Sequence, residues 1–243
     1  MNLAITKIPD CECLIADDMR DWFNTDQKFS DLFPRDALKI STDHPFVSLL
    51  QQKVPEGQAY DLGGFPAVTV IDTNFSKLVE TPVQPMTMKI MPALVGEIKA
   101  GGRNRFIMSK QDLAVLEEKF KELEATPAGD QFLRAEGYQT LRRTQMAIEV
   151  WALNEVMKGK IFDLVTMYLV GQRRFSMHTD SEVLIEEETI TGEKSGIYNF
   201  DFGEVLYGGM IRFTCAYTVG YFIIKDFTIM KEVQVKLGEG GLV

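Results

Sequence analysis

Residues 146–170 constrain the fold more than any other part of the chain. Apolar and polar residues alternate over 146–153, which predicts a half-buried β-strand. One face carries Met146, Ile148, Val150 and Ala152, and the other carries Gln145 and Glu149. After Asn154 the apolar spacing becomes helical, which predicts an amphipathic helix ending near Val170. The expected apolar stripe is Met157, Ile161, Leu164, Val165 and Tyr168, with Lys158, Lys160, Asp163 and Thr166 opposite. A strand joined so tightly to a helix indicates the centre of an α/β domain, and no catalytic equipment lies on the joint.

The bulk composition sets the class of protein. The chain has 243 residues, of which 45% are apolar and 25% charged, so it can bury a sizeable core. We expect an α/β (α+β) fold with a mixed, mostly antiparallel sheet flanked by helices. A net charge of −9 argues against a protein that grips nucleic-acid phosphates. No apolar run approaches the length of a membrane span, and no secretory signal opens the chain, so we expect a cytoplasmic protein.

Further elements are predicted before residue 73. A helix is expected over 11–23 with Asp10 as its N-cap, and a second, short helix near 45–52. Residues 65–71 read as a strand whose Pro66 belongs at its first position or on an edge.

Residues 73–141 differ in composition and are rich in proline and methionine. We predict a hairpin in which 94–99 and 103–108 flank Ala100-Gly101-Gly102, followed by a helix that begins at Ser109. The apolar content is too small for an independent core, so we interpret 73–141 as an insertion into one domain spanning 1–243.

The C-terminal third is predicted to be mostly strands. Residues 182–191 and 195–200 suggest a hairpin, and 211–219 alternate as a second clean strand. The extension 220–243 alternates again through Phe227 and Ile229. Two interpretations of it stand equally: an arm that pairs with a neighbouring subunit, or a last strand of the chain's own sheet.

Few residues are candidates for chemistry. Cys11, Cys13 and Cys215 form neither a disulfide framework nor a zinc site, and small core thiols explain them better. The glycines before Arg103 and Arg105 lack the spacing of a phosphate-binding loop. A hairpin tip explains them, so these two arginines are assigned to a contact surface.

Two other groupings carry charge. His178 and Asp180 follow Arg173 and Arg174, but a histidine–carboxylate pair needs a nucleophile or a metal beside it, and none is evident. We therefore expect no catalytic, cofactor-binding or metal-binding residues, and we add Arg173, Arg174, Phe227 and Ile229 to the predicted subunit contacts. Glu186, Glu187 and Glu188 are either a solvated face or an acidic surface that repels a polyanion.

The strand at 65–70, the strand–helix unit at 144–169 and the late strand at 210–218 follow an N-terminal helix in this order. Together they resemble the tail terminator proteins of long-tailed bacteriophages. The insertion at 73–141 and the extension at 220–243 depart from shorter members, and the added surface would suit a contractile-tailed virus.

The resemblance implies a structural virion protein of the tail or neck region, assembled in the host cytoplasm, and not an enzyme. It would form a homohexameric ring that caps the completed tail tube, ends tube and sheath polymerisation and joins the tail to the head connector. DNA would pass through the lumen without specific binding, beside Glu186, Glu187 and Glu188. The alternatives are another head–tail neck or head-completion protein, a tail-tube subunit, or, from another class, a small α/β enzyme using His178 and Asp180.

Overall fold

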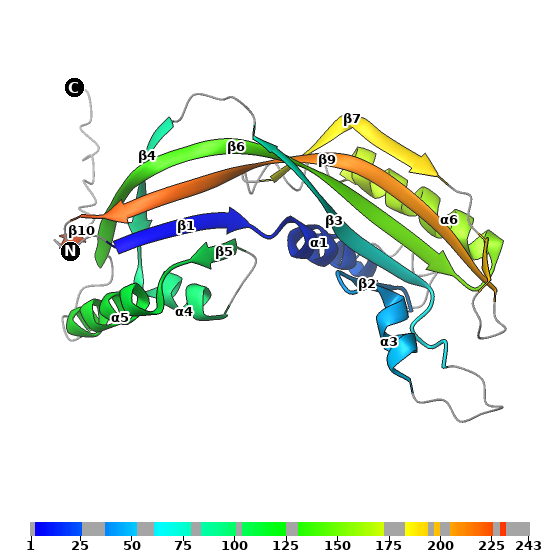
Figure 1. The fold of residues 1–243 in the computed structure, drawn as a ribbon, viewed down its shortest axis with the longest axis horizontal. Helices are drawn as coiled ribbons and strands as arrows, with labels where there is room; N and C mark the ends of the chain where they lie inside the picture. Colours follow the sequence, from blue (N-terminus) through cyan, green and yellow to red (C-terminus); the bar gives the residue numbers. More distant parts are fainter. Residues whose placement is uncertain are drawn as a thin grey trace, which may run out of the picture. The chain divides into compact units, whose positions relative to one another are not determined.

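A computed structural model describes residues 3–25, 37–52, 61–78, 84–100, 104–124, 131–172, 183–193, 197–199, 205–225 and 229–231. Its strands form one ten-stranded sheet whose main path is β2-β3-β6-β9-β1-β5 (Figure 1). These six strands span Lys39–Ser41, Ala67–Leu78, Gln131–Ala152, Val205–Ile224, Leu3–Pro9 and Asn104–Ile107. Off this path, β4 (Gln84–Ile90) and β10 (Ile229–Lys231) pair with β6, and β7 (Val183–Glu193) and β8 (Ile197–Asn199) pair with β9.

The pairing directions confirm the predicted fold class. β2 runs parallel to β3. The pairs β1–β9, β3–β6, β4–β6, β10–β6, β7–β9 and β8–β9 are antiparallel. Helices α1 (Cys11–Thr25), α3 (Pro45–Gln51), α4 (Pro92–Ala100), α5 (Lys110–Glu124) and α6 (Glu155–Met167) flank the sheet, and α6 continues into a short π-helix, Tyr168–Gln172. The protein is therefore a helix-flanked, mixed and mostly antiparallel α/β fold.

The chain divides into two compact units that share β6 and β9. The first unit comprises 1–8, 82–140 and 219–243, and the second 9–81 and 141–218. The predicted insertion, 73–141, falls mainly in the first unit. Whether the chain acts as one domain stays a prediction.

The first unit packs β1, β4 and the adjoining ends of β6 and β9 with α4 and α5. Its core consists of Leu3, Ile5, Ile90, Val95, Leu116, Phe120, Leu133, Ala135, Phe222 and Ile224. Gly137 of β6 lies directly on the backbone of β9, where an added Cβ would be 1.9 Å from the Tyr221 carbonyl oxygen. Only glycine permits this approach of the two strands.

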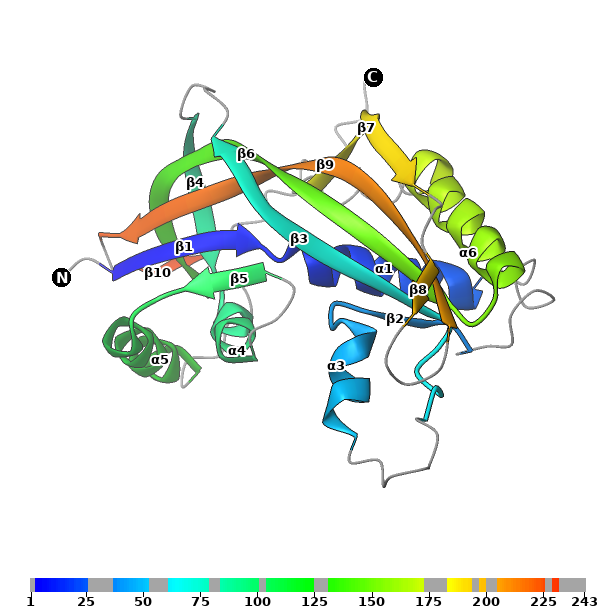
Figure 2. The ribbon, with the colours of Figure 1, turned by 45° about the vertical axis from the view of Figure 1, so that its right-hand side comes forward.

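The second unit sets β3, β6 and β9 side by side, with helices α1 and α6 on one face (Figure 2). Helix α1 contacts β2 and β3. Phe162 of α6 packs over Gly192 and Gly209, which leave room for its ring. The two helices meet where the Tyr168 hydroxyl donates to Oδ2 of Asp18 at 2.6 Å. Helix α3 lies near Trp151, where Phe65, Ala67, Trp151 and Leu206 form a small core with Phe46 and Leu62.

Several predicted elements and caps are confirmed. The Asp10 carboxylate accepts a hydrogen bond from the Cys13 N–H at the start of α1, and α3 begins at Pro45. The Ser109 hydroxyl accepts from the Asp112 N–H ahead of α5. The strand–helix joint is also present, because β6 ends at Ala152 and the Asn154 side chain caps α6.

Two predicted hairpins are wrong. Residues 94–99 belong to α4, because Pro92 suits a first helical turn and Leu94, Val95 and Ile98 recur at helical spacing. Strands β7 and β8 do not form a hairpin with each other. Both pair with β9, which is 20 residues long, so β7 and β8 pair with different segments of it.

Two further predictions needed adjustment. Strand β6 begins at Gln131, well before residue 146, because β4 and β10 supply partners for its first part. The buried face of α6 is Lys158, Ile161, Phe162 and Val165. Lys158, expected on the polar side, is only 6% exposed, since the helix turns the Phe162 side toward the sheet.

Candidate functional site

Most of the predicted contact residues lie outside the described residues. This holds for Arg103, Arg173, Arg174 and Phe227, and also for His178 and Asp180. Arg105 and Ile229 lie in β5 and β10, but their side chains are not described. The backbone of β10 pairs with residues 131–133 of β6, so this short piece of the extension belongs to the chain's own sheet.

The three consecutive glutamates lie in β7 but do not share one environment. Glu186 pairs with Arg143 of β6 at 2.5 Å. The register of β7 shifts between Glu186 and Thr191, so the intervening residues are not in regular pairing with β9. Glu188 is exposed, and the Glu187 side chain is not described. At least one carboxylate of the triplet is therefore paired within the subunit.

A groove lies over β6 and β9 in the second unit. Its volume is about 530 Å³, and its polar lining is Thr73, Gln145, Thr189, Thr191, Arg212 and Thr214. Met146 and Phe213 complete the lining. Thr73 is placed in the groove by the irregularity of β3 between Asp72 and Phe75, and its hydroxyl donates to the Gln145 carbonyl at 2.6 Å. The lining thus mixes hydroxyls, methyl groups and one cation.

Arg212 is the charged centre of this surface. It alternates along β9 with the buried Ile211 and Phe213 and is itself exposed. It also lines a smaller hollow of about 130 Å³ with Glu149, Trp151, Glu193 and residues 208–210. The alternation of residues 211–219 predicts that Arg212 lies on the polar side of β9, but no local sequence pattern predicts the irregularity of β3 at Thr73.

His44 makes specific contacts beside the smaller hollow. Its Nε2 lies 2.9 Å from Oε2 of Glu149, and the Trp151 indole N–H donates to the same oxygen at 3.0 Å. The His44 ring also stacks near Phe46, with centroids 4.8 Å apart. His44 immediately precedes α3 and anchors that helix to β6 through Glu149.

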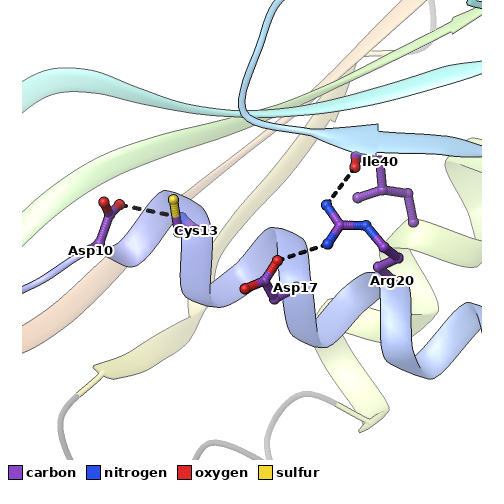
Figure 3. A network of polar contacts seen from close by, with 5 residues as sticks. All are labelled: Asp10, Cys13, Asp17, Arg20 and Ile40. Carbon is purple, nitrogen blue, oxygen red and sulfur yellow. Dashed lines mark hydrogen bonds and ion pairs between the residues drawn. The ribbon is translucent and has the colours of Figure 1, made fainter. Parts of the chain in front are cut away.

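A polar network lies along α1 (Figure 3). Arg20 of α1 pairs with Asp17 at 2.8 Å and donates to the Ile40 carbonyl at 2.8 Å, which ties the helix to β2. At the N-terminus of the helix, the Asp72 N–H donates to Oε1 of Glu12, and Thr144 donates to Oδ1 of Asp72 at 3.0 Å. These contacts hold α1 against β2 and β3 and tie β3 to β6.

The cysteines bear out the expectation of core thiols in two cases. Cys11 and Cys215 are buried and Cys13 is half-buried, and none of the three forms a disulfide. Burial, reinforced by the charges of Asp72 and Asp10, raises the pKa of Cys11 to about 12. Burial also raises the pKa of Tyr217 above its ordinary value. Cys11 therefore stays a neutral thiol near pH 7 and is poorly suited to act as a nucleophile.

Aromatic side chains lie together on the solvent-exposed side of the first unit. The rings of Tyr138 and Tyr221 lie 5.5 Å apart, and the Lys89 ammonium is 5.0 Å from the centre of the Phe132 ring. Tyr138 is exposed. Exposed tyrosines are common at protein interfaces, and such side chains favour contact with another protein.

Within the described ranges, no cluster of three or more His, Cys, Asp or Glu side chains could hold a metal ion. In the same part of the chain, no helix is both long and apolar enough to cross a membrane. No protein-family model matches the chain, and a search of curated proteins found no significant match.

Proposed function

We propose that the protein is the subunit of a ring that caps a completed bacteriophage tail tube, ends its growth and joins the tail to the head connector. The observation that carries the proposal is the arrangement of the three segments that resemble tail terminators. They are β3, the β6–α6 unit and β9, and they lie as neighbouring strands in one sheet, with α1 and α6 on the same face.

The polar features of the second unit also support a structural role. The Arg20, Asp72 and His44 contacts each tie a helix or loop to the sheet, which is what an assembly subunit needs. The aromatic side of the first unit and the groove around Arg212 offer two surfaces for protein contacts. A ring uses such surfaces in a heterologous, head-to-tail interface that closes.

The proposal is tested by adding the purified chain to tail-tube protein of the same virus during tube polymerisation. Negative-stain microscopy should show shorter tubes that carry a ring at one end and do not resume growth when more tube protein is added. Buffer and a heat-unfolded sample of the chain serve as controls. If the chain alone forms long tubes, it is a tube subunit and the proposal is wrong. If tubes grow normally in its presence, the capping role is wrong.

A further inference from the structure

The β6–α6 joint exposes two large apolar side chains, Leu153 and Val156, to solvent. Val156, in the first turn of α6, is 70% exposed, the highest value among the large apolar side chains described. Leu153 is 42% exposed, and Glu155 between them is also exposed. We call residues 153–156 the joint knob. It combines two apolar side chains with one carboxylate.

The groove over β6 and β9 has the complementary character. Its described lining contains Arg212, threonine hydroxyls and methyls, Met146 and Phe213, and the Glu149 and Glu193 carboxylates line the smaller hollow on the other side of Arg212. A chain with 35 acidic and 26 basic residues repels its own copies at most contacts, so an exposed arginine among hydroxyls marks where a copy can approach favourably.

We propose that the joint knob of one subunit occupies the groove of a second copy, with Glu155 paired to Arg212 and Val156 packed on the threonine methyls. Knob and groove are different surfaces of one unit, so the contact is head-to-tail and can repeat around a ring. The proposal rests on the ring function for its biological meaning but concerns only the contact between copies.

Charge reversal tests the ion pair. Sedimentation of the full chain over a range of concentrations gives the strength of self-association. Arg212→Glu and Glu155→Arg should each weaken it by about tenfold or more, and the double variant should recover most of the loss. Lys160→Glu, which reverses an exposed charge on α6, is the matched control and should associate like the wild type.

Glu155→Arg also places a cation in the first turn of α6, which opposes the helix dipole. The neutral Glu155→Gln variant therefore accompanies it, with thermal unfolding as the check on folding. The apolar half is tested by Val156→Ser against Met167→Ser, which removes a 49% exposed apolar side chain elsewhere on α6. Only the first should weaken association.

The outcomes separate the contact from the function. A wild-type chain that is monomeric at every concentration overturns the contact, as does a folded double variant without recovery. If the wild type caps tubes while Arg212→Glu and Glu155→Gln associate and cap equally well, the contact is wrong and the function stands. If the contact is found but wild-type rings leave tube growth unaffected, the contact stands and the capping function is wrong.

Discussion

The hydroxyl of Tyr168 donates a hydrogen bond of 2.6 Å to Oδ2 of Asp18, joining the end of α6 to the middle of α1. The Tyr168 side chain is fully buried, and the Trp22 ring lies 5.3 Å from it. This hydrogen bond and this ring contact both help to hold together the two helices that cover one face of the second unit.

Tyr168→Phe keeps the ring and removes the hydrogen bond. We expect the free energy of unfolding to fall by about 1–2 kcal/mol, because the Asp18 carboxylate loses a donor in a partly buried site. Both tryptophans of the chain, Trp22 and Trp151, lie in the second unit. Urea unfolding followed by tryptophan fluorescence thus reports on the unit concerned. Tyr138→Phe, at an exposed ring of the first unit, should leave the midpoint unchanged, and an equal shift in both variants would contradict the role of this bond.

The cap of α6 gives a second prediction. The Asn154 side-chain oxygen accepts a hydrogen bond of 2.8 Å from the Met157 N–H. Asn154→Ala should lower the free energy of unfolding by about 1 kcal/mol, whereas Asn154→Asp retains an acceptor and should cost little. The same fluorescence measurement compares them. Equal losses in both variants would mean that the cap is not what holds this end of the helix.

Local signals account for what the sequence predicted well. The caps at Asp10 and Ser109 and the alternation of β9 around Phe213 depend on neighbouring residues, so they could be recognised before the fold was known. The mixed sheet followed from the same patterns.

The strand pairings that the sequence did not predict are long-range. The first part of β6 pairs with β4 and β10, and β7 pairs with β9. No local pattern records such a choice of partner. Burial of Lys158 likewise depends on how α6 is turned on the sheet, and the groove at Arg212 needs a bulge in a different strand.

Gly137 provides a prediction for the first unit. Because an added Cβ would lie 1.9 Å from the Tyr221 carbonyl oxygen, Gly137→Ala must push β6 away from β9. We expect a loss of about 1–3 kcal/mol or more, as in other overpacked sites. Hydrogen-exchange mass spectrometry should show faster exchange in peptides covering 131–140 and 219–225.

Gly96→Ala is the control, since nothing lies within 4 Å of its added Cβ and α4 should gain about 0.5–1 kcal/mol. Unchanged protection in Gly137→Ala would show that the strands can separate at little cost.

The raised pKa of Cys11 predicts how stability depends on pH. The thiol has an ordinary pKa of 9.0 when unfolded and about 12 when folded. Between these values the unfolded chain has released the proton and the folded chain has not. Stability is therefore unaffected by this group below about pH 9 and falls as the pH rises above it, by at most about 1.4 kcal/mol per pH unit. Burial also raises the pKa of Tyr217, so this group lowers the stability further at higher pH. Urea unfolding at pH 8 and pH 10 should show a smaller decline for Cys11→Ala than for the wild type. Identical slopes for Cys11→Ala and the wild type would mean that the Cys11 thiol is not held protonated by its surroundings.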